Sequence, residues 1–190
     1  MLLGANDAML PIPTARQSVP LEEYRANLKA IITHPNITAH SPKVLLVTPP
    51  PIDELAMLEC DMAKGMGQLS RSARNTSKYA QVAREIAADV PGTMLIDLWR
   101  AVRNRAVELT PDWVQEDGSG KPWLGTLESG TRGGFKTLLT DGLHMDHEAY
   151  KLLFGLVSPH ILVDDNREDH EKDVFPPWWV LNKAKTIETI

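Results

Sequence analysis

Lys43-Val44-Leu45-Leu46-Val47-Thr48 is a short continuous apolar run, and Pro49-Pro50-Pro51 stops it. A run without polar alternation is typical of a strand that is covered on both faces, as in a parallel sheet. Residues 93–98 form a second run of this kind after the turn Pro91-Gly92. Residues 1–3 are also apolar and stop at Gly4, which indicates the end of a third buried strand.

Helical patterns separate these strands. The first has apolar residues three or four positions apart after Val19-Pro20, and Pro35 is expected to end it. Its apolar stripe consists of Leu21, Tyr24, Leu28, Ile31 and Ile32. Further helices are predicted over residues 72–89, from residue 98 to Leu109, and over about 146–162, where Pro159 is expected to end the helix early. Alternating helices and short strands predict an α/β layered fold with a parallel sheet, whose functional residues gather at the carboxyl ends of the strands.

Two stretches lack a sustained pattern. Residues 53–72 are ambiguous, and Gly65 and Gly67 favour a loop after a short helix. Residues 110–134 are rich in Gly, Ser, Thr and Pro and contain Trp113 and Trp123. We interpret this second stretch as a long loop, which in a compact domain is usually functional or mobile.

The end of the chain has a different composition. Residues 164–173 contain six acidic and two basic residues, a charge of −4 out of the total of −5. This composition indicates an exposed acidic linker. An apolar stretch with Trp178-Trp179 follows, and it is expected to dock as a C-terminal arm. We therefore expect one domain over residues 1–163 and a linker with a tail over residues 164–190.

Length, charge and cysteine content exclude several classes of protein. The 190 residues correspond to one domain or to part of a larger one. With 25 acidic and 20 basic residues, the chain has no basic field for a nucleic acid. The single cysteine, Cys60, excludes an intramolecular disulfide or a multi-cysteine zinc site. No apolar run approaches the roughly 18–20 residues that cross a bilayer, and residues 1–11 do not resemble a secretory signal.

Asp141-Gly142-Leu143-His144 is the first candidate for chemistry. A carboxylate three residues before a histidine can fold back onto one imidazole nitrogen and leave the other nitrogen as a general base. Taken alone, the spacing favours a simpler interpretation, a helix cap at Asp141 with an incidental histidine. A weaker alternative is a zinc site formed by His144 and His147 with Asp141 and Asp146.

Gly4-Ala5-Asn6-Asp7 is the second candidate. At the end of a strand, an asparagine amide can donate a hydrogen bond to a developing oxyanion. Gly4 would permit an unusual backbone angle or a close approach. Taken alone, the motif favours a simpler interpretation, an Asx turn after a strand in which Asn6 and Asp7 bond their own backbone.

The order of the two motifs resembles the SGNH (GDSL-type) hydrolase superfamily, in which G-x-N-D precedes D-x-x-H. The closer resemblance is to the isoamyl acetate-hydrolysing esterase group. The matching segments are Gly4 to Ala8, Val19 to Tyr24, Thr48 to Pro51 and Thr140 to His144. The likeness covers about Leu2 to Leu162, and it implies a three-layer α/β/α, flavodoxin-like fold.

The resemblance also implies roles for individual residues. Asn6 would donate to the oxyanion, His144 would act as general base and then as acid, and Asp141 would orient His144. Gly4 and Asp7 would shape the loop around Asn6. The expected substrate is a small ester with a short, acetate-like acyl group, and no metal or organic cofactor is implied.

The nucleophile of that family is a serine in a G-D-S motif that precedes G-x-N-D, and this sequence has no G-D-S. None of its serines has a matching context: Ser18, Ser41, Ser70, Ser72, Ser77, Ser119, Ser129 and Ser158. We therefore expect an N-terminally truncated domain without its first strands, unstable or inactive alone. The visible N-terminus favours a cytoplasmic location without settling the compartment, and the oligomeric state is open.

Two other functions remain open. One is a non-catalytic binding module in which the Trp113 and Trp123 loop and the tail form a partner surface. The other is a metal-dependent enzyme built on His144 and His147.

Overall fold

The sheet is built on two parallel strands, β1 (Val44–Val47) and β2 (Thr93–Ile96), with Val44 opposite Thr93 and Val47 opposite Ile96. The structure is a computed structural model that describes residues 1–13, 16–114 and 120–161. Leu2 forms a single parallel bridge to Val47, whose N–H donates to the carbonyl of Met1 at 2.8 Å. The apolar start of the chain therefore continues the parallel sheet along the other edge of β1 by this one bridge. It is not the buried strand end that its composition predicted, because Leu2 and Leu3 are 38% and 42% exposed.

The predicted helices form, and several of them begin at a residue suited to that place. α1 (Leu21–Ile32) begins after Pro20 with two acidic residues in its first turn. Asp53 caps α3 (Glu54–Ala63), Ser72 caps α4 (Ala73–Asp89) and Asp97 caps α5 (Leu98–Glu108), in each case by accepting from backbone N–H groups. These side chains satisfy donors that a helix leaves unpaired at its start.

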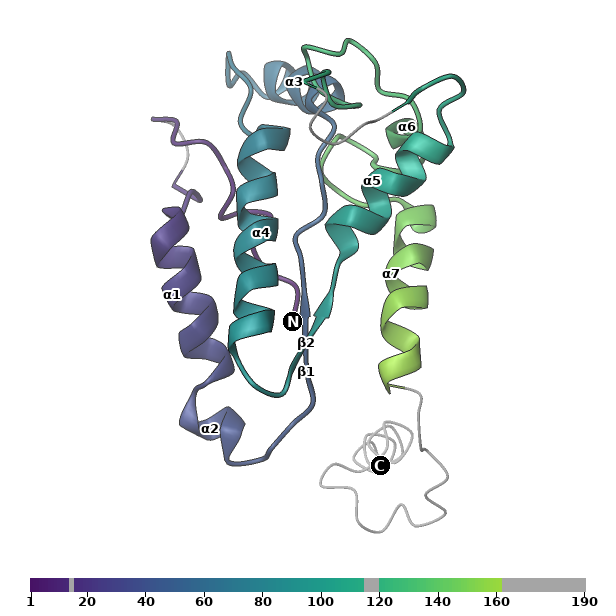
Figure 1. The fold of residues 1–190 in the computed structure, drawn as a ribbon. Helices are drawn as coiled ribbons and strands as arrows, with labels where there is room; N and C mark the ends of the chain where they lie inside the picture. The colour runs from purple at the N-terminus through teal and green to yellow at the C-terminus, as the bar shows by residue number, and fades with distance from the viewer. Residues whose placement is uncertain (14–15, 115–119, 162–190) are drawn as a thin grey trace, which may run out of the picture. The chain divides into compact units, whose positions relative to one another are not determined.

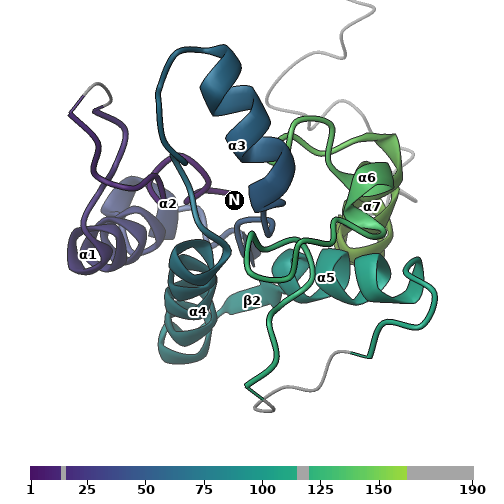
Figure 2. The ribbon, with the colours of Figure 1, turned by 90° about the horizontal axis from the view of Figure 1, so that it is seen from above.

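Helices lie on both faces of the strand pair. Leu46 packs with α1 and α4, whereas Leu45 and Val47 pack with α5, α6 (Phe135–Leu138) and α7 (His147–Ile161). Because successive residues of a strand point to opposite faces, these are two separate cores. The ribbon shows α1 and α4 on one side of the strands and α5 and α7 on the other (Figure 1). The view from above shows the same division (Figure 2).

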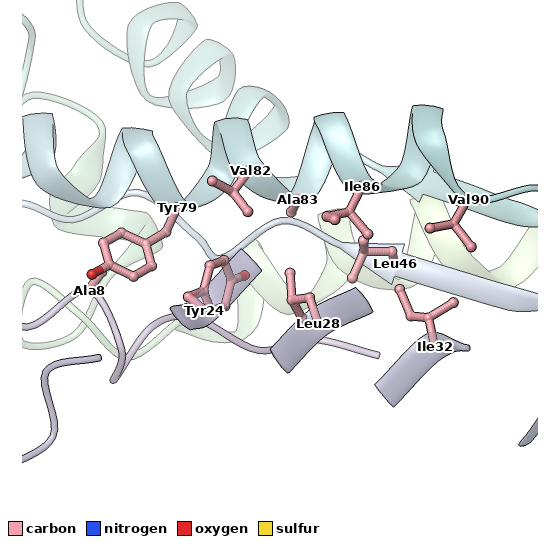
Figure 3. Packing of buried hydrophobic residues seen from close by; sticks show 10 residues of the cluster. All are labelled: Ala8, Tyr24, Leu28, Ile32, Leu46, Tyr79, Val82, Ala83, Ile86 and Val90. Carbon is pink, nitrogen blue, oxygen red and sulfur yellow. The ribbon is translucent and has the colours of Figure 1, made fainter. Parts of the chain in front are cut away.

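The core between α1, α4 and β1 follows from the helical spacing of the sequence. Tyr24, Leu28 and Ile32 of α1 face α4, and the rings of Tyr24 and Tyr79 lie 5.0 Å apart (Figure 3). The buried members are Ala8, Tyr24, Leu28, Ile32, Leu46, Tyr79, Val82, Ala83, Ile86 and Val90. Ala8 brings the loop after Gly4 into this core, which ties that loop to the framework.

Several details differ from the sequence predictions. In β2, Met94 and Leu95 are more than a third exposed, so this strand is not buried along its length. Its only partner among the described residues is β1. α1 ends before Pro35, and Pro35 itself begins a short helix, α2 (Pro35–Thr38). A proline fits the first position of a helix because the N–H group that it lacks would have no partner there. α7 continues past Pro159 to Ile161, since one lost bond in a last turn does not end a helix.

The long segment between α5 and α6 is irregular in its described parts, as predicted, but it is anchored. Leu124 and Thr126 are buried, and Trp113 packs against the core of α5 to α7. Trp123 meets Trp99 edge to face, with centroids 6.0 Å apart, and the Arg103 guanidinium lies within 4.6 Å of both ring centroids. Both loop tryptophans are therefore part of the packing.

The chain divides into two compact units, Met1–Ser158 and Pro159–Ile190. The acidic segment 164–173 and the Trp178-Trp179 arm of the sequence analysis lie outside the described residues. Among the helices that are described, none combines the length and apolar character that crossing a membrane requires.

Candidate functional site

The Asp141–His144 loop is closed on itself between α6 and α7. Leu139 and Met145 form an antiparallel bridge, and the N–H of Thr140 donates to the carbonyl of His144 at 2.9 Å. Asp141 Oδ1 accepts from the backbone N–H groups of Leu143 at 3.1 Å and His144 at 2.9 Å. The backbone of the loop alone therefore fixes the position of the Asp141 carboxylate.

The second oxygen of Asp141 holds the imidazole. Asp141 Oδ2 lies 2.8 Å from Nδ1 of His144. An ionised carboxylate can only accept hydrogen bonds, so Nδ1 carries the proton that is shared in this contact. In the neutral ring the lone pair is then on Nε2, which is the nitrogen a general base must present.

Asp141 is ionised near neutral pH. Burial alone would raise the pKa of this carboxyl group. The hydrogen bonds from the His144 backbone, the His144 side chain and the Leu143 backbone, with the charge of His144, outweigh that effect and lower the pKa from 3.8 to about 2. Asp141 is thus a negatively charged acceptor that holds the His144 ring by Nδ1.

We expect the stability difference between the wild-type chain and Asp141→Asn to depend on pH. Because the folded pKa of Asp141 is depressed, its stabilisation is present above the unfolded pKa of about 4 and is lost as the pH falls toward about 2. With the side chain 26% exposed, we expect about 1–2 kcal/mol near neutral pH. Urea unfolding of both proteins between pH 6 and pH 2 measures the difference, and a constant value over this range would contradict the assignment.

The Gly4–Asp7 loop lies where the first apolar residues end, at the carboxyl end of β1. The N–H of Ala8 donates to the Gly4 carbonyl at 2.9 Å, which closes a tight turn. Gly4 has φ +110°, and a Cβ there would lie 2.7 Å from the Tyr24 hydroxyl oxygen. That hydroxyl donates to the Leu3 carbonyl at 3.2 Å. Gly4 is therefore required both by its backbone angle and by the close approach of Tyr24.

One cavity brings the two loops together. It has a volume of about 290 Å³, and both Asn6 and His144 line it. Its other lining residues are Leu2, Leu3, Gly4, Ala5, Asp7, Pro50, Leu143, Met145 and Tyr150. The structure thus places four of the five predicted site residues around one cavity, and Asp141 reaches it through His144.

No serine, threonine or cysteine is among the described residues that line this cavity, whose lining carries one side-chain hydroxyl group, that of Tyr150. The serines with assigned contacts serve the local structure. Ser72 caps α4, Ser77 donates to the carbonyl of Arg74 and Ser129 donates to the carbonyl of Thr126. Ser119 lies outside the described residues.

The metal alternative gains no support from the geometry. His147 contacts its own neighbours, with Nδ1 2.8 Å from Asp146 and Nε2 3.0 Å from Glu148. It lines a different cavity from His144. In residues 1–13, 16–114 and 120–161, no three histidine, cysteine or acidic side chains gather in a way that would hold a metal ion.

Arg71 is a contact of the site that sequence patterns did not single out. Its guanidinium Nη2 donates to Asn6 Oδ1 at 3.2 Å, although the two residues are 65 positions apart. It lies just before Ser72, in the stretch 53–72 whose structure was ambiguous from the sequence. No local spacing connects Arg71 with Asn6.

The chain belongs to the GDSL-like lipase/acylhydrolase family, whose model matches residues 1–157. This match covers both site loops and confirms the SGNH resemblance. It is also compatible with the α/β fold and parallel sheet described above.

Individual relatives agree with this family. The isoamyl acetate-hydrolyzing esterase 1 homolog of Mus musculus is 27% identical over 186 residues, covering 97% of this chain and 62% of the relative. The homolog of Homo sapiens is 28% identical over 85% of this chain and 54% of the relative. A GDSL esterase/lipase of Arabidopsis thaliana is 30% identical over 163 residues, covering 83% of this chain and 56% of the relative. The chain thus spans between 54% and 62% of the length of these relatives.

Proposed function

We propose that Asn6, Asp141 and His144 are the oxyanion donor, the orienting carboxylate and the general base of a carboxylic-ester hydrolase site. The observation that carries this proposal is the single cavity lined by Asn6 and His144, with Asp141 holding Nδ1 of His144. Gly4 and Asp7 support the loop that presents Asn6. The family match is consistent with this chemistry.

The mechanism follows from the donor and acceptor pattern. Nε2 of His144 takes a proton from an attacking hydroxyl group as its oxygen bonds to the ester carbonyl carbon. The carbonyl oxygen then becomes an oxyanion, to which the Asn6 amide donates a hydrogen bond. The imidazolium, stabilised by Asp141, returns the proton to the leaving alcohol as the C–O bond breaks. No step needs a metal or an organic cofactor.

The cavity supports a small substrate. Its volume of about 290 Å³ is at the lower end of ligand pockets, which span roughly 300–1,000 Å³. Leu2, Leu3, Pro50 and Met145 give it an apolar wall. A short acyl group such as acetate fits this size, and the mammalian relatives carry the name of an isoamyl acetate-hydrolyzing esterase homolog.

The nucleophile is the part of the mechanism that these residues do not supply. The family resemblance implies a serine in a G-D-S motif, which the sequence lacks. We propose that the 190-residue chain alone provides the base and the oxyanion donor and hydrolyses esters at a rate close to background. Deleting the nucleophile of a serine protease costs about 10⁶ in turnover, which sets the scale of this loss.

We propose a corresponding organisation of the chain. The helices on both faces of β1 and β2 support the three-layer α/β/α, flavodoxin-like arrangement that the resemblance implies. Residues 1–163 would form a partial hydrolase domain without its first strands, and residues 164–190 a linker and tail.

The proposed function can be tested by adding a nucleophile from solution. Methanol attacking p-nitrophenyl acetate needs a base to take its proton, so His144 should accelerate methanolysis in the cavity. We expect a methanol-dependent release of nitrophenol that falls by about 10²-fold in His144→Ala, the lower end for a general base. The matched control is His147→Ala, since His147 is equally exposed but lines another cavity.

The outcomes separate the alternatives. Equal rates for the wild-type chain and His144→Ala, with His147→Ala also unchanged, would overturn the catalytic assignment and favour a binding module. Rapid hydrolysis without methanol that depends on His144 would overturn the proposal that the chain alone is inactive.

A further inference from the structure

The guanidinium of Arg71 is buried against the Gly4–Asp7 loop. Arg71 is only 6% exposed. Its Nε donates to the backbone carbonyl of Ala5 at 3.2 Å, and its Nη2 donates to Asn6 Oδ1 at 3.2 Å. Two donors of one rigid group thus contact the backbone and the side chain of adjacent residues in the loop.

These contacts decide which way the Asn6 amide faces. A guanidinium has only donors, so the amide end that meets it must be the oxygen. The NH₂ end of Asn6 therefore points away from Arg71. An oxyanion donor needs its N–H groups to be available, which is the orientation that Arg71 enforces.

Ion pairing does not explain the burial of Arg71. The acceptors that its guanidinium meets among the described residues are neutral oxygens of Ala5, Asn6, Gln17 and Ser70. Burial lowers the pKa of Arg71, and the carboxylates of Asp61 and Asp141 act against that effect. A charge buried on neutral partners is costly, so its benefit must lie in the geometry that it imposes.

We propose that Arg71 is a positioning residue that fixes the Asn6 amide, and with it the backbone at Ala5, for hydrogen bonding to the oxyanion. Its role in catalysis rests on the proposed function, whereas its effect on the Asn6 amide is independent of any activity.

The direct test is the side-chain amide signal of Asn6 in a ¹⁵N NMR spectrum, assigned by its loss in Asn6→Ala. In Arg71→Met, we expect this signal to shift and its relaxation to report faster motion of the amide. Arg74→Met is the matched control, because Arg74 lies three residues away and its side chain is 69% exposed. We expect Arg74→Met to leave the Asn6 signal unchanged.

Kinetics in the same variants supply a second measurement. A misplaced oxyanion donor weakens binding of the transition state more than binding of the ester. We therefore expect kcat for methanolysis to fall about tenfold in Arg71→Met while KM changes less than twofold. A tenfold rise of KM with an unchanged kcat would contradict a positioning role.

A further variant guards against misfolding of Arg71→Met. Arg71→Lys keeps the charge but removes the rigid fork that contacts Ala5 and Asn6 together, so the Asn6 signal should shift in it as well. An unchanged Asn6 signal in a folded Arg71→Met or Arg71→Lys protein would overturn the inference. If no protein shows His144-dependent methanolysis, the proposed function fails, and the amide signal still decides the inference about Arg71.

Discussion

Replacing Asp53 by alanine is expected to lower the free energy of unfolding by about 3–5 kcal/mol, the cost of breaking a buried ion pair from one side. The Asp53 side chain has no exposed surface, and its Oδ2 accepts from Nε of Arg132, which is 24% exposed. Its Oδ1 accepts from the N–H groups of Leu55 and Ala56 and so caps α3. The alanine variant loses both functions at once.

Two further variants separate these functions. Asp53→Asn keeps a capping oxygen and removes the charge, so it should lose less stability than Asp53→Ala. Combining Asp53→Ala with Arg132→Met in a double-mutant cycle gives the coupling between the two side chains.

An exposed ion pair provides the control. Glu128→Ala removes a contact to Arg74 in which both side chains are more than 60% exposed, and it should cost less than about 1 kcal/mol. Urea unfolding measures all of these variants. A loss below 1 kcal/mol in Asp53→Ala would show that the buried pair adds nothing to the fold.

The parts of the fold that sequence patterns predicted are those determined over short distances. The apolar spacing indicated the buried face of α1, where Tyr24, Leu28 and Ile32 are buried, although Ile31 of the predicted stripe is 40% exposed. The run before Pro49 indicated β1. The exposure of β2 was not predictable, because it depends on which elements cover that strand. The helix α6 has only four residues, too few for a periodic pattern.

In the candidate site too, the sequence patterns predicted the local contacts and missed those that depend on the tertiary fold. Asp141 and His144 meet because three residues separate them, which the sequence displays directly. Their approach to Asn6 requires the sheet to bring residues more than 130 positions apart to one cavity, and the family resemblance supplied that expectation. Neither source predicted Arg71, since its contact with Asn6 depends on how the chain returns between α3 and α4.

The loop that carries His144 depends on a glycine as much as on the contact between Asp141 and His144. Gly142 has φ +88°, and a Cβ there would lie 2.5 Å from the backbone oxygen of Asp53 and 2.5 Å from the backbone nitrogen of Met57. The Gly142 carbonyl accepts from the N–H of Asp53 at 2.9 Å. Backbone atoms at the start of α3 cannot move aside as a flexible side chain would, so the loop itself must shift.

We therefore expect Gly142→Ala to lower the free energy of unfolding by about 2–6 kcal/mol, the sum of roughly 1–3 for backbone strain and 1–3 for overpacking. His144-dependent methanolysis should fall as well, because a shift of the loop displaces the His144 imidazole that Asp141 orients. Gly92→Ala is the matched control, with φ +79° and no atom within 4 Å of the added Cβ. It carries the strain of the backbone angle without the collision, so the difference between the two variants in urea unfolding isolates the contact with α3. Equal losses in Gly142→Ala and Gly92→Ala would show that this contact does not hold the loop in place.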